Sequence, residues 1–291
     1  MRRAALLFNP RAGAHRAKRL AAIRGALAGE FALELQPTRD PAHCRALAGA
    51  ALTERLDALF VLGGDGTLRV VAGVVAGREL AVGILPGGTT NVVARALGLP
   101  AEPVAAARVL ARAEPRRFDV GRCGDEVFLM QLSGGLDARI MAAVDPRLKR
   151  RLGQGAIAWT GVREWLRYRF PAFRLELDGR AVEATGFVVA NLAEYAGRFR
   201  IVPGARADDG QLDLLLFHGA HRRAALGFAF DLARGRHLAR PDVELAAARE
   251  IRLLAPEGAV VQADGDAFTP TLPLAIGLAA GSIRLLAPSR R

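Results

Sequence analysis

Cysteine is scarce in this chain of 291 residues, which has only Cys44 and Cys123, far apart in the sequence. That scarcity excludes a disulfide framework and a cysteine-based zinc site, and it favours a reducing compartment. Lysine is equally scarce, since Lys18 and Lys149 are the two lysines. The chain contains no Gly-Lys-Ser or Gly-Lys-Thr, which excludes a Walker-type phosphate loop.

Long hydrophobic runs are also missing. No stretch reaches the roughly 18 apolar residues that a transmembrane helix needs. The apolar run Ala4 to Phe8 is too short for the core of a signal peptide and is interrupted by Asn9-Pro10. We interpret it as the first strand, and we expect a cytoplasmic protein.

The net charge of +12 is compatible with nucleic acid, with an anionic membrane or with an arginine-rich composition. No nucleic-acid-binding module is recognisable, so we expect no nucleic-acid partner. Residues 146–174 combine many arginines with Trp159, Trp165 and Tyr168, a mixture that suits a membrane surface. An ordinary helix that buries its aromatic side chains and exposes its arginines is an equally good interpretation.

The most informative segment is Val61 to Thr67, Val-Leu-Gly-Gly-Asp-Gly-Thr. It follows Ala58 to Leu62, a continuous apolar run typical of a buried parallel strand. It precedes Leu68, Val71, Ala72 and Val75, which share one face of a helix. Glycines at a helix N-terminus let backbone N–H groups approach an anion, so the loop predicts a phosphate site.

Two further loops repeat this arrangement. Pro86 to Asn91, Pro-Gly-Gly-Thr-Thr-Asn, lies between the apolar run Leu80 to Leu85 and a predicted helix over Val92 to Leu97, with Thr90 or Asn91 as its N-cap. Asn9 to Gly13 follows the first strand. Because open α/β sheets bind ligands at the carboxyl ends of their strands, we expect the three loops to share one edge.

These motifs resemble those of the diacylglycerol kinase and sphingosine kinase catalytic family of lipid kinases. The resemblance continues in order along nearly the whole chain, through Asp208 to Asp213 (Asp-Asp-Gly-Gln-Leu-Asp) and Asp264-Gly265-Asp266. Asn191, Tyr195, Gly197 and Pro203 to Ala205 also match the family pattern. Glycine loops alone also occur in NAD kinases and phosphofructokinases, and the later motifs favour the lipid group.

Two domains are expected. Residues 1–120 alternate strand-like and helix-like runs, which indicates a Rossmann-like parallel α/β domain. Residues 121–291 contain short apolar runs separated by turns, such as Val127 to Leu132, Phe173 to Leu177 and Leu212 to Phe217, and indicate a β-sandwich. The resemblance implies the same division, with ATP on the first domain and the active site in the cleft between the two.

The resemblance implies that ATP is the co-substrate. Its phosphates would be held by Asn9, Thr38, Gly63, Gly64, Asp65, Gly66, Thr67, Gly88, Thr89 and Asn91. Phosphoryl transfer also needs a divalent cation, and Asp65 would hold Mg²⁺ directly or through water. Asp65 as the cap of the helix that follows it is the alternative. Asp119 would join the same acidic network, or would be a turn residue.

A second, structural Mg²⁺ is implied by the resemblance at Asp209, with the carbonyls of Arg206 and Gln211. By composition alone the Asp208-Asp209-Gly210 segment is a tight turn. Asp264 is the candidate general base, ahead of Asp266, which stands where the family has Glu. Asp-Gly is also the sequence of a β-hairpin turn, so that interpretation competes.

The family commonly has acidic residues where this chain has Val70 and Val92. Their absence leaves the lipid acceptor open among diacylglycerol, sphingoid and ceramide-like molecules. It also keeps two alternatives open, an NAD kinase-type enzyme and a non-catalytic nucleotide- or lipid-binding relative. We expect peripheral association with a membrane surface, and a homodimer remains open.

Overall fold

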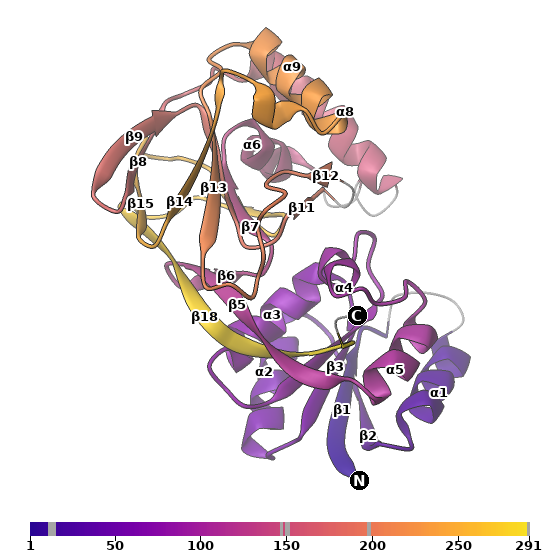
Figure 1. The fold of residues 1–291 in the computed structure, drawn as a ribbon. Helices are drawn as coiled ribbons and strands as arrows, with labels where there is room; N and C mark the ends of the chain where they lie inside the picture. Colours follow the sequence, from indigo (N-terminus) through magenta and orange to yellow (C-terminus); the bar gives the residue numbers. More distant parts are fainter. Residues whose placement is uncertain (11–15, 146–147, 149–151, 197–198, 290–291) are drawn as a thin grey trace. The chain divides into compact units, whose positions relative to one another are not determined.

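The computed structural model describes residues 1–10, 16–145, 148, 152–196 and 199–289, which form two compact units (Figure 1). Unit 1 comprises Met1–Val120 with Ala280–Arg291, and unit 2 comprises Gly121–Ala279. Several residues of the sequence interpretation lie outside the described residues: Gly13, Arg147, Lys149, Arg150, Arg151 and Gly197.

The last segment of the chain returns to unit 1. β18 (Leu274–Ala287) starts in unit 2, and its end pairs in parallel with β4 (Ala81–Pro86) through Arg284 with Ala81 and Leu285 with Val82. Our expected second domain, 121–291, therefore extends beyond unit 2 at its C-terminal end. A single strand shared by the two units leaves no composition boundary at which such a return could be detected.

Unit 1 is built on a parallel sheet in the order β2-β1-β3-β4, continued by the end of β18. Its further strands are β1 (Arg2–Phe8), β2 (Phe31–Pro37), β3 (Ala58–Gly63) and β5 (Glu114–Cys123), the last running into unit 2. Its helices are α1 (Arg16–Leu27), α2 (Pro41–Thr53), α3 (Asp65–Val75), α4 (Val92–Ala96) and α5 (Pro103–Ala111).

The apolar pattern explains this layering. All six residues of β4 are buried, as a central parallel strand covered on both faces requires. The helices pack in pairs, α1 with α5 and α2 with α3. α3 buries Leu68, Val71, Ala72 and Val75, the face predicted from their spacing.

The strand register brings the predicted loops to one edge. Phe8 at the end of β1 is paired with Pro37 of β2 and with Leu62 of β3, and Gly63 is paired with Pro86 of β4. The residues that follow these four strands therefore start at the same edge of the sheet. This confirms the expectation for the loops after β3 and β4 and for Asn9, which follows β1. Thr38, which follows β2, starts at the same edge.

Unit 2 is a sandwich of two antiparallel sheets, which confirms the expected fold class. One sheet has the order β14-β13-β10-β7-β16-β17, and in the other the start of β18 continues into β15-β8-β9. The first set is β14 (Val243–Ala248), β13 (Leu212–Phe217), β10 (Gly186–Ala190), β7 (Gln131–Gly134), β16 (Val261–Ala263) and β17 (Asp266–Phe268). The second set is β15 (Ile251–Ala255), β8 (Phe173–Leu177) and β9 (Arg180–Ala184), and the short strands are β6 (Glu126–Phe128), β11 (Glu194–Tyr195) and β12 (Phe199–Arg200).

Alternation along the strands divides the core of unit 2 in two. Phe187, Val189 and Leu214 face the other sheet, where they pack with Leu175 and Leu253. The intervening residues of β10 and β13, Val188 and Leu215 among them, form a second cluster with Leu232 of a helix. The six-stranded sheet is therefore covered on both faces.

Helices form the outer layer of unit 2: α6 (Leu136–Ala143), α8 (Gln154–Arg167), α9 (Arg222–Ala233) and the 3₁₀ turn η1 (His237–Ala239). α6 packs on β16 and β17 and against α8. Within the part of the chain that the structure describes, no helix has the length and apolar character needed to cross a membrane.

Candidate active site

Two glycine pairs of unit 1 pack backbone against backbone. Gly87 N–H donates to the carbonyl of Gly63 at 2.9 Å. A Cβ on Gly88 would lie 2.6 Å from Cα of Gly64, and one on Gly64 would lie 3.1 Å from Cα of Gly88. Glycine is therefore required in each pair, because the backbone of the other pair leaves no room for a Cβ atom. The two loops form one surface at the carboxyl edge of the sheet.

Asp65 joins these loops. Its Oδ2 accepts hydrogen bonds from Thr90 Oγ1 and Val92 N, and its Oδ1 accepts one from Val93 N, each at 3.0 Å. The carboxylate thus caps α4, the helix after the second loop, rather than α3, in which it is the first residue. The capping alternative was correct in kind and wrong about which helix is capped.

Asn91 is the N-cap residue of α4, as predicted, but its side chain holds the loop. Asn91 Oδ1 accepts from Gly88 N at 2.8 Å and Asn91 Nδ2 donates to Gly88 O at 2.9 Å. Asn91 itself has φ +46°, in the left-handed region. Because Asp65 supplies the cap and Asn91 locks Gly88, the second loop is fixed before any ligand arrives.

The other predicted ATP residues lie along the same edge. Asn9 follows β1 and is exposed, and Thr38 follows β2, is buried and donates its backbone N–H to Phe8 O at 2.8 Å. Thr67 lies in the first turn of α3, close to Gly63. Gly66, Gly88 and Thr89 are exposed, but the N–H group of Gly88 already donates to Asn91 Oδ1, so Gly66 and Thr89 are the exposed positions that an anion could approach.

Asp119 makes a different contact. It lies in β5, is buried, and accepts a hydrogen bond from Gly281 N of β18 at 2.6 Å. Gly281 has φ +55°, so Asp119 holds a point where the last strand bends through a conformation that favours glycine.

Asp264 lies in a two-residue turn between β16 and β17. Asp264 has φ +52° and Gly265 has φ +92°, and Ala263 pairs with Asp266 across the turn. Two positive φ angles are characteristic of a type I′ hairpin, so the hairpin interpretation is confirmed for the backbone. Asp266 begins β17 and is exposed.

The Asp264 carboxylate faces the loop between β6 and β7. Its Oδ2 accepts from Leu129 N at 2.6 Å, and its Oδ1 accepts from Met130 N at 2.9 Å and Gln131 N at 3.0 Å. The same loop is held by Asn191, whose Nδ2 donates to Leu129 O at 2.8 Å. Asn191 belongs to the sequence pattern, and its contact shows that it supports the partner of Asp264.

A buried polar network lies behind this turn, and the sequence analysis did not find it. Gln262 Oε1 accepts from Gly265 N at 2.6 Å, and Gln262 Nε2 donates to Ser133 Oγ at 2.6 Å. Ser133 Oγ donates in turn to Asp137 Oδ2 at 2.5 Å, and the Tyr195 hydroxyl donates to the same oxygen at 3.3 Å. The network connects the half-buried Asp137 carboxyl group to the backbone of the Asp264 turn.

Burial determines the protonation behaviour of this network. Loss of contact with water raises the pKa of Asp137, although Ser133, Ala138, Gln262 and Tyr195 all donate to it. Burial and the neighbouring Asp137 charge raise the pKa of Tyr195. The pKa of Tyr168 is raised for the same two reasons.

One sequence signal would have pointed to Asp137. Ser133-Gly134-Gly135-Leu136-Asp137 is a third glycine pair at a strand-to-helix junction followed by an acid, as in Gly63-Gly64-Asp65. Gly135 has φ +126°, so its glycine is required by the backbone. Without the fold, nothing in that stretch connects it with residue 265.

The predicted structural-metal loop is compact. Asp209 Oδ1 accepts from Gln211 N at 3.1 Å, and the Arg206 guanidinium donates to Asp208 Oδ1 at 3.2 Å. Burial, and then the negative charge of Asp209, raise the pKa of Asp213. Across the described ranges, no three His, Cys, Asp or Glu side chains gather as a metal cluster.

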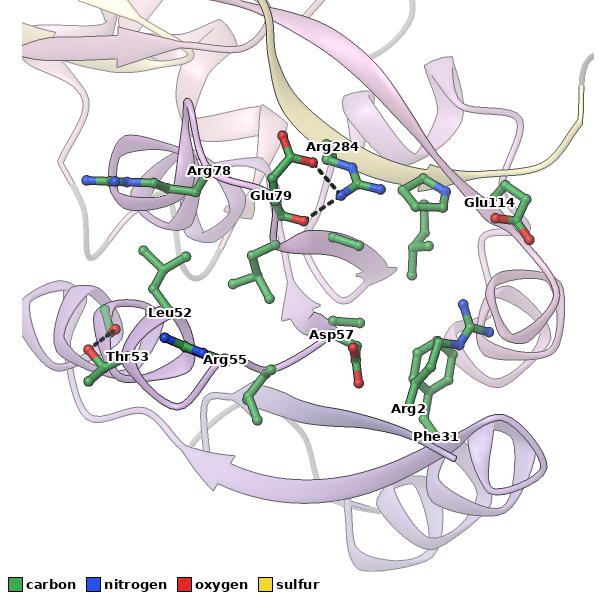
Figure 2. Close-up of a pocket in the computed structure, with 17 residues that line it drawn as sticks. Arg2, Phe31, Leu52, Thr53, Arg55, Asp57, Arg78, Glu79, Glu114 and Arg284 are labelled. Atoms are coloured by element: carbon green, nitrogen blue, oxygen red, sulfur yellow. Dashed lines mark hydrogen bonds and ion pairs between the residues drawn. The ribbon is translucent and has the colours of Figure 1, made fainter.

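A pocket of about 840 Å³ in unit 1 lies elsewhere (Figure 2). Arg2, Ala58 and Ala81, which line it, stand at the amino ends of β1, β3 and β4. Glu79 and Arg284 form an ion pair at 2.8 Å on its wall. Since parallel sheets bind ligands at the opposite edge, this pocket is not the candidate active site.

Comparison with known proteins agrees with this fold. The family model of the diacylglycerol kinase catalytic domain matches residues 3–123, and that of the YegS C-terminal NAD kinase beta sandwich-like domain matches residues 130–287. A protein of Chromohalobacter salexigens named probable lipid kinase YegS-like is 39% identical over 160 residues, 53% of this chain and 51% of that protein. A diacylglycerol kinase of Mycobacterium tuberculosis is 31% identical over 257 residues, 86% of this chain and 82% of that protein.

Solved structures show the same architecture. A crystal structure from Bacillus anthracis strain Sterne superimposes with a TM-score of 0.82 at 22% identity, covering 98% of this chain and 97% of the other. An α/β unit combined with a β-sandwich unit is the fold that this chain shares with that structure. The chain belongs to the diacylglycerol kinase-like family of lipid kinases.

Proposed function

We propose that this protein transfers the γ-phosphate of ATP to a hydroxyl group of a diacylglycerol, sphingoid or ceramide-like lipid. The observation that carries the proposal is the packing of Gly63-Gly64 against Gly87-Gly88 at the carboxyl edge of the unit 1 sheet. The first loop leads directly into α3 and offers the backbone N–H groups of a helix N-terminus to a polyphosphate. The second loop supports it, because the N–H groups of Gly87 and Gly88 donate to Gly63 O and Asn91 Oδ1. Membership of the family supplies the reaction class.

ATP would bind along this edge. The phosphates would contact the backbone of Gly63 to Thr67, the Thr67 hydroxyl and the exposed Gly88 and Thr89. Asn9 and Thr38, which follow the two neighbouring strands, would flank the nucleotide. Asn91 would act by holding Gly88 in place, because both polar atoms of its side chain are already bonded to that residue.

A catalytic Mg²⁺ fits Asp65 through water better than by direct contact. A carboxylate has about four acceptor positions, and Thr90, Val92 and Val93 occupy three of them. Mg²⁺ keeps several of its waters in proteins, so one remaining position is enough for an outer-sphere role. Bound there, the ion would neutralise charge on the transferring phosphate. Asp119 would contribute a further carboxylate.

A second Mg²⁺ would be held by Asp209 and the carbonyls of Arg206 and Gln211. Asp209 and Asp213 lie close enough for their negative charges to interact, and a positive ion at this loop would relieve that repulsion. Its role would be to stabilise the loop before β13.

Asp264 would take the proton of the lipid hydroxyl. Its backbone turn and its bonds with Leu129 to Gln131 hold the carboxylate in place before the substrate binds. Asp266, exposed on the same hairpin, would assist at the acceptor.

Location and partners follow from the same proposal. With a lipid acceptor the enzyme would act at a membrane surface as a peripheral protein, and the use of ATP together with the free Cys44 and Cys123 supports a cytoplasmic location. A homodimer is compatible with this function but is not required by it.

Purified protein incubated with labelled ATP, Mg²⁺ and detergent-dispersed diacylglycerol, monoacylglycerol, sphingoid base and ceramide tests the proposal, with NAD as a separate acceptor. We expect label on a lipid and its loss when the divalent cation is chelated. Label on NAD alone would make the protein an NAD kinase-type enzyme. ATP binding without transfer to any acceptor would make it a non-catalytic relative, in keeping with Val70 and Val92.

A further inference from the structure

Helix α8 buries two polar side chains together with Ala156 and exposes a stripe of apolar side chains. Its inward face carries Thr160 and Glu164, which are 3% and 6% exposed. Its outward face carries Trp159, Val162 and Leu166, which are 68%, 55% and 51% exposed. The three apolar residues are spaced i, i+3 and i+7, so they form one stripe. A helix on the surface of a soluble protein has the opposite arrangement.

Ion pairs fix this orientation. Glu164 Oε2 lies 3.5 Å from Arg139 of α6, and Glu164 Oε1 lies 3.2 Å from Arg163. Rotating α8 to bury its apolar stripe would separate Glu164 from Arg139 and would leave Arg139 with one fewer partner. The exposure of Trp159 is therefore a consequence of how α8 is anchored.

Helix α9 extends the apolar stripe. Its Leu226 and Phe230 are 58% and 56% exposed. Trp165 Nε1 of α8 donates to the Arg222 carbonyl at the start of α9 at 2.9 Å, which ties the helices together. In Figure 1, α8 and α9 lie on the same side of unit 2. The apolar side chains of the two helices thus belong to one region.

The charge of this region is predominantly positive. α8 and α9 contain two acids, and both are in ion pairs, Glu164 with arginines and Asp231 with Arg240 at 2.7 Å. Arginines accompany the apolar side chains, and the Arg234 guanidinium lies 3.4 Å from the centre of the Phe230 ring. We define the α8–α9 face by its apolar and basic members: Trp159, Val162, Arg163, Leu166, Arg167, Arg222, Arg223, Leu226, Phe230 and Arg234.

We propose that the α8–α9 face docks the protein onto a bilayer that contains anionic lipids. Aromatic and aliphatic side chains enter the boundary between headgroups and acyl chains, and arginines pair with lipid phosphates. A second copy of this chain is a poorer occupant. A two-fold contact would place arginine against arginine, because neither helix exposes an unpaired acid within its described residues.

This docking surface is an addition to the proposed function. It rests on the proposed function in one respect, because a lipid acceptor is the reason for the protein to bind a membrane. Binding is measured without nucleotide, so the two can fail separately. Lipid phosphorylation in detergent without vesicle binding would overturn the docking and leave the kinase proposal standing. Vesicle binding without phosphorylation would overturn the kinase proposal and leave the docking proposal standing.

Full-length protein is sedimented with phosphatidylcholine vesicles and with vesicles in which about a third of the lipid is phosphatidylglycerol. We expect binding to the anionic vesicles and a blue shift of tryptophan emission, absent in Trp159→Phe, since Trp159 and Trp165 are the two tryptophans. Leu166→Ala with Phe230→Ala should weaken binding about tenfold or more. Arg167→Gln with Arg223→Gln should weaken binding to anionic vesicles by about fivefold for each arginine, and should leave binding to phosphatidylcholine vesicles unchanged.

The controls are Leu245→Ala on the edge strand β14, half exposed and apolar, and Arg249→Gln in the turn after it. Both should bind as the wild-type protein does, and thermal melts should show every variant folded. Equal binding by the α8–α9 variants and the controls would overturn the proposal. So would a dimer in solution that Phe230→Glu dissociates, because a second copy would then cover the face.

Discussion

Asp264 and Asp178 occupy the same position in two separate hairpins. Each is the first residue of an Asp-Gly turn with positive φ at both positions, +52° and +92° for Asp264-Gly265 and +47° and +83° for Asp178-Gly179. Each carboxylate accepts backbone N–H bonds from another loop, Asp178 from Arg249 and Glu250. A turn of this kind is therefore a structural device of unit 2, and only the surroundings of Asp264 point to chemistry.

This pair gives the sharpest test of the base. Asp264→Asn replaces an acceptor oxygen with an amide donor that would face Leu129, Met130 or Gln131 N–H, so at least one hydrogen bond is lost. We expect a loss of about 1 to 3 kcal/mol in the free energy of unfolding. We also expect transfer to the lipid to fall about 100-fold or more while ATP binding persists.

Asp178→Asn is the matched control, measured by urea unfolding and initial rates. It should lower stability for the same reason and leave kcat within about twofold of the wild-type value, since it removes no base. If both substitutions lower kcat equally, the effect at Asp264 is structural and the catalytic role is wrong.

Gln262→Leu tests whether the buried network positions the turn. The substitution removes the acceptor of Gly265 N and the donor to Ser133. We expect kcat to fall about tenfold with the KM for ATP unchanged, because misplacement of a reacting group raises the barrier without touching the nucleotide. Gln36→Leu on β2 is the control, since the side chain of Gln36 donates to Glu34 in unit 1. A rise in the KM for ATP with unchanged kcat would contradict the positioning role.

Asp65→Asn tests the hydrogen bonds by which Asp65 connects the two glycine loops. The amide would meet Thr90 Oγ1, Val92 N or Val93 N as a second donor, so the cap of α4 is weakened. We expect a loss of about 1 to 2 kcal/mol of stability and at least about tenfold weaker binding of a non-hydrolysable ATP analogue by calorimetry.

Asp57→Asn provides the comparison at the other edge of the same sheet. Asp57 Oδ2 accepts from Arg3 N at 2.6 Å, so its loss also costs stability. Nucleotide affinity should stay unchanged. Equal weakening of the nucleotide by both variants would show that Asp65 acts through general stability alone.

Asp137 gives unit 2 a defined dependence on pH. Its native pKa is raised above the ordinary value of 3.8 by burial. Between 3.8 and the native pKa, the folded protein binds the proton that the unfolded chain has released. The contribution of Asp137 to the free energy of unfolding is therefore largest at low pH and falls as pH rises to the native pKa.

The measurement is urea unfolding of wild type and Asp137→Asn from about pH 3.5 to about pH 8. Comparing the two removes the effect of the other carboxylates, which titrate in the same range. We expect the stability of wild type relative to Asp137→Asn to decline with increasing pH and then level off. A difference that increases with pH would mean that the native pKa is lowered, contrary to the burial argument.

The sequence by itself determined the local elements and the fold class. The apolar runs Phe173 to Leu177 and Leu212 to Phe217 form strands with those bounds, and the face of α3 is the predicted one. Such patterns are readable because burial imposes a period of 2 on strands and 3.6 on helices. The glycine loops were also readable, since they stand directly between a strand and a helix.

Tertiary structure alone decided the partners of the carboxylates. Asp65 binds residues 27 and 28 positions away, and Asp264 binds a loop more than 130 positions away. The predicted single run Val127 to Leu132 is divided into β6 and β7 because the amides between them point to Asp264. Local sequence cannot specify such bonds, because they depend on which loops the folded chain brings within about 3 Å of one another.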